Sequence, residues 1–461
     1  METDGHPSSI LAETRSVCPI CLRSLTAVRS REDDAVFLIK TCPEHGQFRT
    51  RIWRGALPMT AWQRPKKPSV PLAPVPVSGK GCPFDCGLCV EHKQHTCTAL
   101  LEITARCNLR CKVCFADAGG KPRQDPPLER ISFLYDQILR NSGPCNIQLS
   151  GGEPTVREDL ADIIRLGRSK GFSFLQLNTN GIRLAESASY CRDLQEAGLS
   201  SVFLQFDGIS DDIHLAIRGR ALAAIKEQAI VHCGAAGLGV VLVPTIIPGI
   251  NNGQMGEIIR YGVRFSPTVR GVHFQPVSYF GRYPAPPQDH DRITLPEIME
   301  QLAGQYHGEI STGHFAPPAC EHALCSFHAN YLIQPDGRLH ALGAGRQVCC
   351  SNSGSLVDAR EGRDKSVAFT ARQWAASPAG DCAGTAPAED GDELDAFLRR
   401  ARTHSFSISG MAFQDAWNLD LERLQGCCIH VMSPAGRLIP FCAYNLTASD
   451  GRSLYRNTEA G

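Results

Sequence analysis

Seven cysteines between residues 82 and 114 are spaced as metal ligands are: Cys82, Cys86, Cys89, Cys97, Cys107, Cys111 and Cys114. The first three follow the spacing C-x3-C-x2-C, and the last three repeat it. A structural zinc site or a closed iron–sulfur cluster needs four protein ligands. With Cys97, the upstream group has four, so we expect a closed [4Fe–4S] cluster there, with zinc as the alternative. The downstream group has three, which leaves one iron of a four-iron cluster open.

Short apolar strands alternating with amphipathic helices must position these cysteines. Six strand-like segments follow residue 98, at residues 99–104, 145–152, 172–180, 201–208, 239–247 and 271–279. The segments between them have helical spacing of apolar residues, and Gly171 and Gly198 act as stops. Successive β–α units indicate a parallel sheet with right-handed crossovers. Six units are too few for an eight-stranded barrel, so the sequence predicts an α/β fold with an open, partial (β/α)6 barrel.

Residues that a core would not need stand where these strands end. The first strand runs into Cys107, the second ends in Gly151, Gly152 and Glu153, the third ends in "NTNG", and the fourth ends at Asp207. Chemistry in parallel α/β folds takes place at the carboxyl ends of the strands. The sequence therefore predicts one site in which the three-cysteine group faces these glycines and polar residues.

This arrangement, with "SGGEP" after the second strand, resembles the radical S-adenosylmethionine (SAM) enzymes over residues 99–282. In that family the open iron binds the amino and carboxylate groups of SAM, and reduction of the sulfonium releases a 5′-deoxyadenosyl radical that abstracts hydrogen. The resemblance implies an electron donor such as ferredoxin or flavodoxin. It implies that the cluster ligands are Cys107, Cys111 and Cys114, and that SAM is bound by Phe115, Gly151, Gly152, Glu153, Asn178, Asn180 and Asp207. From the residues alone, part of a zinc site is the alternative.

A separate ligand pattern lies within residues 1–64. Cys18 and Cys21 form one knuckle, and Cys42 and His45 form another, with an apolar strand-like segment between them. Mixed cysteine and histidine ligands indicate a zinc-ribbon or rubredoxin-like unit that holds one zinc or one mononuclear iron. We expect a structural role, because so short a unit has little core of its own. Residues 65–98 then form a proline-rich linker and the upstream cysteine group, in which His92 is expected to hydrogen-bond around the metal.

Residues 301–461 are expected to form a C-terminal extension of the partial barrel at residues 99–300. It contains a hairpin with a Pro-Asp-Gly turn and further cysteines. We expect a third cluster over the barrel mouth, held by Cys320, Cys325, Cys427 and Cys442. Adjacent cysteines rarely both reach one metal, so Cys428 should point elsewhere, and the pair at 349 and 350 should supply at most one ligand. Residues 351–390, with many small and polar residues, predict a loose surface segment, and Cys382 within it has no expected role.

Composition limits the remaining possibilities. The chain has 461 residues, 21 cysteines and a formal net charge of zero, so two to four domains are expected and no basic field is available to hold nucleic acid. It has no run of 18 apolar residues and no signal-peptide pattern, which predicts a cytoplasmic protein. Cysteines in a cytoplasmic chain favour metal over disulfides. Single cysteines within apolar segments, such as Cys145, Cys191 and Cys233, are expected to be ordinary core residues.

The run from "GCPFDC" to "CFADAG", with "CPEHG" before it and "CCIHVMSPAGRLIPFCAYN" near the end, resembles the tetraether lipid synthase branch of the superfamily. In that branch three [4Fe–4S] clusters accompany an N-terminal mononuclear metal, and the methyl ends of two lipid chains are joined. The resemblance implies a lipid substrate, peripheral membrane contact, and Cys427 and Cys442 as ligands, with Cys428 where another residue is usual. The alternatives are radical modification of a peptide or small metabolite and, in another class, a metal-scaffolded binding protein.

Overall fold

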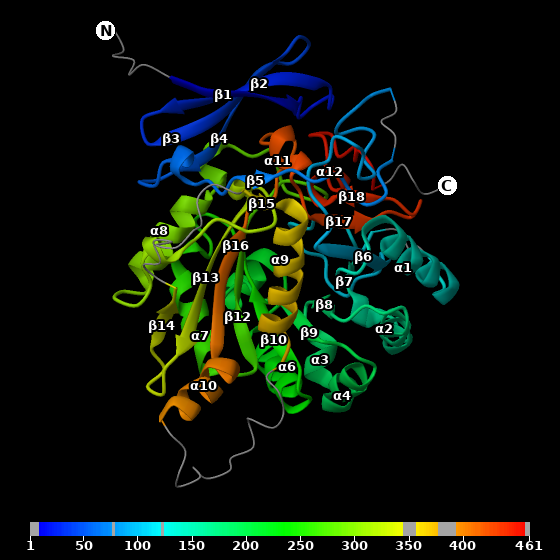
Figure 1. Cartoon of the computed structure of the whole chain (residues 1–461), viewed down its shortest axis with the longest axis vertical. Helices are drawn as coiled ribbons and strands as arrows, with labels where there is room; N and C mark the ends of the chain where they lie inside the picture. Colours follow the sequence, from blue (N-terminus) through cyan, green and yellow to red (C-terminus); the bar gives the residue numbers. More distant parts are fainter. Residues whose placement is uncertain (1–8, 76–78, 121–123, 344–355, 377–392, 457–461) are drawn as a thin grey trace.

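The computed structural model describes residues 9–75, 79–120, 124–343, 356–376 and 393–456. A small antiparallel sheet, which we call the ribbon, lies over one end of a larger α/β body (Figure 1). None of the helices in the described ranges has the length and apolarity needed to cross a membrane.

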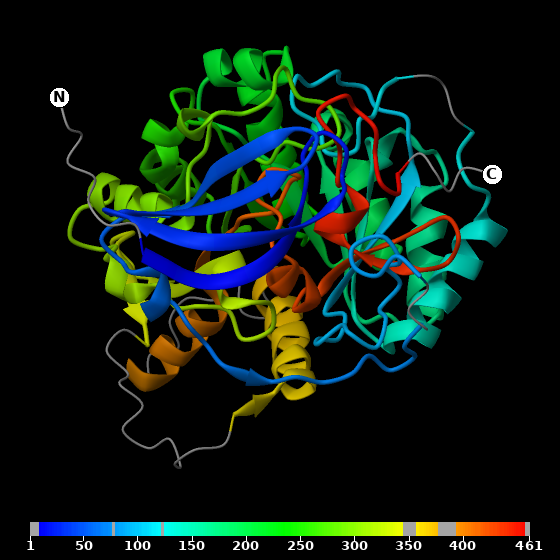
Figure 2. The same ribbon diagram turned by 90° about the horizontal axis from the view of Figure 1, so that it is seen from above.

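The ribbon contains four antiparallel strands in chain order: β1 (Ser9–Val17), β2 (Ser24–Glu32), β3 (Ala35–Cys42) and β4 (Gly46–Arg54). The β1–β2 and β3–β4 turns carry the two predicted ligand knuckles. Because the strands run up and down in sequence, both turns lie at the same end of the sheet (Figure 2).

Buried polar contacts attach the ribbon to the C-terminal part of the chain. Lys40, which is 2% exposed, donates hydrogen bonds to the Ser16 hydroxyl and the Ala416 carbonyl. Arg29 forms a 2.6 Å ion pair with Asp420, and both side chains are buried. Breaking a buried pair of this kind by removing one partner costs about 3–5 kcal/mol. The ribbon is therefore fixed to the body rather than tethered by the linker alone.

The larger sheet has a parallel series of strands in chain order: β6 (Thr98–Thr104), β7 (Asn146–Gly151), β8 (Leu175–Thr179), β9 (Ser201–Gln205), β10 (Gly239–Val243) and β12 (Val269–Pro276). Each pairs in parallel with the next, and the short β11 (Thr245–Ile246) pairs with β12. All six predicted strands are confirmed. Their carboxyl ends consequently meet at one edge, as the sequence predicted.

Helices connect these strands: α1 (Leu128–Ser142), α2 (Leu160–Ser169), α3 (Ile182–Glu186), α4 (Ala188–Glu196), α5 (Asp211–Arg218), α6 (Ala223–Ala235), α7 (Met255–Arg264) and α8 (Leu295–Gln305). Sequence signals fix several of their ends. The Ser187 hydroxyl caps α4 by accepting from the Tyr190 N–H, and Thr294 and Glu297 form a capping box on α8. Gly171 and Gly198 follow α2 and α4 with φ of 95° and 106°, values that favour glycine. The apolar faces of these helices pack on the strands in one large core.

Strands from the C-terminal region extend the same sheet at both edges: β13 (Ser326–Ile333), β14 (Leu339–Leu342), β16 (Ser405–Met411), β17 (Ile429–Met432) and β18 (Leu438–Pro440). The order is β14-β13-β16-β12-β10-β9-β8-β7-β6-β17-β18. The predicted hairpin is β13–β14, with Gly337 at a φ of 84° in its turn. Helices α10 (Glu393–Thr403), α11 (Leu421–Gln425) and α12 (Phe441–Tyr444) complete this region, so residue 300 is not the end of the sheet.

The prediction of a loose segment at residues 351–390 is wrong for α9 (Ala359–Trp374), a helix of 16 residues that runs beside the sheet (Figure 1). Few of its residues are apolar, so helical periodicity was not visible. Its position is set by polar contacts: the Arg363 Nε donates to the Thr96 carbonyl at 2.8 Å. Just before it, β15 (Val357–Asp358) pairs with β5 (Lys66–Lys67) in the linker. Residues 351–355 and 377–390 of the predicted segment, Cys382 included, lie outside the described residues, as do Cys349 and Cys350.

Candidate active site and metal centres

The loop that carries Cys107, Cys111 and Cys114 follows β6 and is held by the segment after β12. Cys114 and Arg282 exchange backbone hydrogen bonds, each 2.9 Å long. The Arg282 Nε also donates to the Cys111 carbonyl at 2.9 Å. Gly281 has a φ of 65°, and a Cβ there would lie 2.4 Å from the Cys114 carbonyl oxygen. The first and last strands of the parallel series thus jointly shape the cysteine loop.

Gly151 and Gly152 allow a close approach to the backbone that precedes this loop. A Cβ on Gly151 would lie 2.2 Å from the Thr104 carbonyl oxygen, and one on Gly152 would lie 2.0 Å from that of Arg106. Their backbone bonds to the same segment include one from the Gly152 N–H to the Thr104 carbonyl at 2.8 Å. In the structure these glycines approach the chain that leads into Cys107, and their contact with a ligand stays a prediction.

Glu153 joins the ends of β7 and β8. Its buried carboxylate accepts hydrogen bonds from Thr155 and from the Thr179 hydroxyl at 2.7 Å, and from the Asn180 N–H at 2.7 Å. The Asn180 side chain in turn donates to Asn108 in the cysteine loop at 2.7 Å. Predicted site residues from three strand ends are therefore brought together in one hydrogen-bonded unit.

Asp207 lies deeper than predicted. It is fully buried and receives two hydrogen bonds of 2.7 Å from the Arg218 guanidinium, at the end of α5. Burial alone would lower the pKa of Arg218, but the charges of Asp207 and of the nearby Cys111 sulfur raise it above its ordinary value. Arg218 lines the cavity described below, whereas Asp207 does not. Arg218 was not predicted from the sequence. The only available sign of it was that Asp207, as a buried carboxylate, would need a partner.

A cavity of about 590 Å³ opens beside the cysteine loop. The predicted site residues that line it are Cys107, Cys111, Cys114, Phe115, Gly151, Gly152, Glu153, Asn178 and Asn180. Two groups of aromatic side chains also line the cavity. In the first group, Phe441 packs on Phe115 and Phe413. In the second group, Phe203 packs on Trp374 of α9. His273 lies against the second group, and burial lowers its pKa to about 4, so it is uncharged near neutral pH. The cavity therefore joins the cysteine loop to an apolar, aromatic space.

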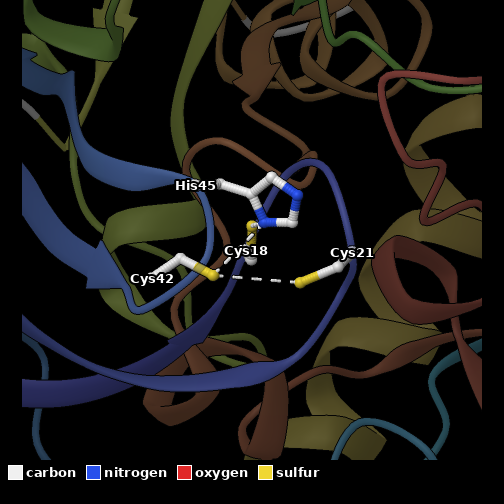
Figure 3. Close-up of side chains that lie close together, drawn as sticks. All are labelled: Cys18, Cys21, Cys42 and His45. Atoms are coloured by element: carbon white, nitrogen blue, oxygen red, sulfur yellow. Dashed lines mark hydrogen bonds between the residues drawn. The ribbon is translucent and has the colours of Figure 1, made fainter.

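The two ribbon knuckles form a compact ligand group (Figure 3). Cys21 Sγ and Cys42 Sγ are 3.9 Å apart, and His45 Nδ1 lies 3.7 Å from Cys18 Sγ and 3.4 Å from Cys42 Sγ. Tetrahedral ligands at 2.3 Å from one zinc would be separated by about 3.8 Å. The donor set and its spacing therefore suit a single ion.

Comparison with known proteins agrees with this geometry. The model of the radical SAM superfamily matches residues 101–262, and that of the HMPTM N-terminal zinc ribbon domain matches residues 10–54. The chain is 35% identical over 479 residues to 7,8-dihydro-6-hydroxymethylpterin dimethyltransferase of Methanocaldococcus jannaschii, covering 94% of this chain and 93% of that protein. The chain belongs to the radical SAM superfamily.

Other similar proteins match only part of the chain. GTP 3',8-cyclase 3 of Mycobacterium bovis is 31% identical over 220 residues, which cover 46% of this chain and 56% of that one. The crystal structure of methylornithine synthase (PylB) has a TM-score of 0.36 at 12% identity, over 46% of this chain and 64% of that one.

As a radical SAM enzyme, the protein uses a [4Fe–4S] cluster and SAM, and its chemistry requires an electron donor. The residues present suit both groups. Three thiols on one loop face the cavity, and the nearby carboxylate of Glu153 and guanidinium of Arg218 match an ammonium and a carboxylate. The buried Asn178 Oδ1 lines the same cavity and has no hydrogen-bond partner within the described ranges. A ligand donor would satisfy it.

The remaining cysteines of this radical SAM enzyme group differently from the prediction. The sulfurs of Cys97, Cys320 and Cys428 all lie within 4.8 Å of one another, and those of Cys97 and Cys428 are 3.1 Å apart. The expectation that Cys428 points elsewhere is therefore wrong, and Cys97, which was expected to complete the group of Cys82, Cys86 and Cys89, lies with Cys320 and Cys428 instead. The reason is sheet register: β17 pairs in parallel with β6, so the Cys97 N–H donates to the Cys428 carbonyl at 2.8 Å. Spacing along the chain carries no sign of that pairing.

Cys325, Cys427 and Cys442, the other predicted ligands of the third cluster, are separated from Cys320 by this regrouping. Electrostatic interactions link all three, and burial raises the pKa of Cys442 to about 12.

Another group lies in the loop that carries Cys82, Cys86 and Cys89. Cys82 hydrogen-bonds with Cys86, which interacts with Cys89. His92 bonds the Cys427 carbonyl at 2.8 Å and His95 bonds Ser69 at 2.8 Å, so hydrogen bonding of these histidines around the upstream metal stays a prediction. Further cysteine groups thus suit additional clusters or zinc.

Proposed function

We propose that this radical SAM enzyme removes one hydrogen atom from an unactivated carbon of each of two lipid chains, consuming two molecules of SAM and two electrons, and that the two carbon radicals combine in a carbon–carbon bond. The observation that carries the proposal is the cavity of about 590 Å³, which connects the three cluster cysteines to aromatic side chains of β9, α9 and α12. An apolar substrate gains roughly 25 cal/mol for each Å² that it buries on such surfaces.

When bound, the cluster and SAM supply a 5′-deoxyadenosyl radical that removes a hydrogen atom from the substrate. The role of this chain is to hold the reactants in place and to exclude water. Cys107, Cys111 and Cys114 hold the cluster, while Glu153 accepts hydrogen bonds from the methionine ammonium and Arg218 donates to its carboxylate. Phe115, packed 5.5 Å from Phe441, is placed to cover the adenine.

The protonation states in the cavity fit a radical step. His273 and His328 both line the cavity, and burial lowers the pKa of each to about 4. Neither carries a positive charge near neutral pH, so an alkyl chain beside them meets no isolated ion. Removal of a hydrogen atom from a saturated carbon also needs no general base.

The organisation of the chain is part of the proposal. The ribbon (1–64) and the linker with its cluster (65–98) precede the SAM-binding partial barrel (99–300), and residues 301–461 complete the substrate cavity. Reduced ferredoxin or flavodoxin would supply the electron, and a lipid substrate would be taken up by peripheral contact with a membrane. The auxiliary cysteine groups would relay electrons or brace the site.

A second candidate is methylation of a pterin, which the name of the 35% identical relative supports. The cavity also presents amides that could pair with a heterocycle, including those of Gln148, Gln205 and Asn330. This candidate differs from the first in its substrate and in the fate of SAM, which would also be a methyl donor.

Anaerobic turnover with labelled substrates separates the two candidates. The reconstituted enzyme would receive SAM, a reductant and either membrane lipids deuterated at their chain ends or 6-hydroxymethyl-dihydropterin, and the products would be analysed by mass spectrometry. We expect deuterium in 5′-deoxyadenosine and a coupled lipid. A methylated pterin, with no deuterium transferred from lipid, would establish the second candidate instead.

A variant of α9 tests the role of the apolar cavity. Phe369→Glu places a carboxylate in the lining, so coupled lipid should fall at least about tenfold while uncoupled cleavage of SAM continues. Phe133→Glu is the matched control, because Phe133 is exposed on α1 and does not line the cavity. Equal loss in both variants would contradict the assignment.

A further inference from the structure

Cys97, Cys320 and Cys428 form a thiol group that the radical site does not use. Three separate segments supply it: the residue before β6, the loop before β13 and the residue before β17. All three sulfurs lie within 4.8 Å of one another. Cys320 is 2% exposed, Cys428 is fully buried and Cys97 is half-buried.

The backbone around the group is fixed from several sides. The Cys320 carbonyl accepts hydrogen bonds from Gln94 Nε2 at 2.6 Å and from Lys66 Nζ at 2.8 Å. The Cys97 N–H donates to the Cys428 carbonyl at 2.8 Å. Arg363 of α9 holds the residue before Cys97 through its carbonyl. The three sulfurs are consequently held together by contacts that do not depend on the sulfurs themselves.

The spacing of the sulfurs distinguishes the kind of metal site. Thiolate sulfurs bound to separate irons of a four-iron cluster lie farther apart than thiolate sulfurs that share one ion, which are about 3.8 Å from one another. The ribbon ligands, with separations of 3.4–3.9 Å, have the second kind of spacing. The Cys97–Cys428 distance of 3.1 Å is nearer to this second spacing than to that of sulfurs on separate irons.

One side of the group faces the cavity. Cys97, Cys428 and Glu321 line the cavity that also contains the cluster cysteines. Glu321 Oε2 lies 3.7 Å from Cys428 Sγ, and the other carboxylate oxygen accepts from the Ser326 hydroxyl. Within the described ranges no fourth cysteine or histidine joins the group. Three protein ligands that leave the fourth position free are typical of an ion that binds an exchangeable ligand.

We propose that Cys97, Cys320 and Cys428 bind one divalent ion, zinc or ferrous iron, whose fourth position opens on the cavity beside Glu321. The ligand for that position is an oxygen of the substrate, such as a hydroxyl or carboxylate. The ion would anchor a polar end of the substrate while the rest of it reaches the radical site. This assignment stands on the thiol geometry and does not depend on which substrate reacts.

Loading with Co²⁺ tests the metal site without turnover. Protein freed of metal would be titrated anaerobically with Co²⁺ in the absence of iron and sulfide, and the ligand-field bands of tetrahedral cobalt–thiolate would be counted. Other cysteine groups of the metal-free protein also take up cobalt, so the count is made by difference: Cys428→Ser and Cys320→Ser should each bind one equivalent less than the wild type. Cys191→Ser, a buried thiol elsewhere, should bind as much as the wild type. Unchanged binding in both serine variants would overturn the proposal.

Iron analysis supplies the second criterion. After reconstitution with iron and sulfide, Cys428→Ser should lose one zinc or one iron. Loss of about four irons would show that the group holds a cluster and would overturn the single-ion assignment.

The open position can be probed with decanoate, a carboxylate on an apolar chain. Adding decanoate to the cobalt-loaded wild type should shift the ligand-field bands of one bound ion. In Cys428→Ser, which lacks the proposed ion, that shift should not occur. Absence of a shift in the wild type would show that the position is closed to the cavity.

Discussion

Two loops of this chain have the same cysteine spacing and different surroundings. We call the loop with Cys82, Cys86 and Cys89 the upstream loop, and the loop with Cys107, Cys111 and Cys114 the downstream loop. All three cysteines of the downstream loop line the large cavity, whereas none of those in the upstream loop does. Spacing alone therefore indicates that both bind metal, while access to the cavity decides which of them can meet a substrate.

The neighbours of the two loops explain the difference. The downstream loop follows a parallel strand and is surrounded by Gly152, Glu153 and Arg218 at neighbouring strand and helix ends. The upstream loop is enclosed by the C-terminal segment, where the Tyr455 hydroxyl accepts from the Cys86 N–H at 2.9 Å and donates to the Pro83 carbonyl at 2.6 Å. The same spacing thus serves an open site in one place and an enclosed one in the other.

The largest expected effect separates the two loops directly. Cys111→Ala should abolish 5′-deoxyadenosine formation, because the cluster that meets SAM loses a ligand, while the ribbon metal stays bound. Cys86→Ala should lower the iron content but retain SAM cleavage. Both variants would be compared with the wild type by iron analysis and by chromatography of anaerobic reactions. If Cys86→Ala alone abolished cleavage, the assignment of the two loops would be reversed.

A second effect tests the backbone beside each loop. Gly152→Ala places a methyl group 2.0 Å from the Arg106 carbonyl oxygen and must displace the chain that leads into the downstream loop. A displacement of this size at an active site costs about 100-fold in rate, so SAM cleavage should fall by at least that factor.

Gly87→Ala in the upstream loop is the matched control. Its new methyl group would meet only side chains, at 3.4 Å or more, and little change in SAM cleavage is expected. Comparable rates for both alanine variants would indicate that the close approach at Gly152 has no part in shaping the site.

The sequence was sufficient wherever the determining contacts are local or lie in consecutive β–α units. The six parallel strands could be predicted because short apolar segments alternate along the chain with helical ones. The ribbon ligands could be predicted because the two knuckles lie close together in the sequence. Cys97 and Cys428 are 331 residues apart and meet through the β6–β17 register, which no local pattern encodes. Helix α9 was missed for a similar reason, since distant contacts hold it, including the bond from Arg363 to the Thr96 carbonyl and the packing of Trp374 on Phe203.

A third, smaller effect concerns the charge beside the downstream loop. Arg218→Gln removes the cation between Asp207 and Cys111 and leaves Asp207 buried without its partner, which should cost about 3–5 kcal/mol of unfolding free energy. The apparent KM for SAM should rise as well.

Asp207→Asn combined with Arg218→Gln should recover much of the stability, because the buried charge is removed, but not the affinity for SAM. Denaturant unfolding and SAM titration measure the two quantities separately. If the double variant regained normal affinity, Arg218 would act only by compensating Asp207.

The smallest effect concerns the enclosure of the upstream loop. Tyr455→Phe removes a hydroxyl that satisfies the Cys86 N–H and the Pro83 carbonyl, and leaving such buried groups unpaired costs about 1–3 kcal/mol. Thermal unfolding should shift accordingly, and iron should leave the upstream loop faster when a chelator is added. Tyr135→Phe is the control, since its buried hydroxyl makes one 3.3 Å bond to the Ile163 carbonyl, away from both loops. Both variants should lose stability, but only Tyr455→Phe should release iron faster, with SAM cleavage preserved in each. If Tyr455→Phe instead slowed SAM cleavage while leaving iron release unchanged, the upstream loop would influence the radical site through its shape, and the contrast between an enclosed and an open loop would no longer account for their roles.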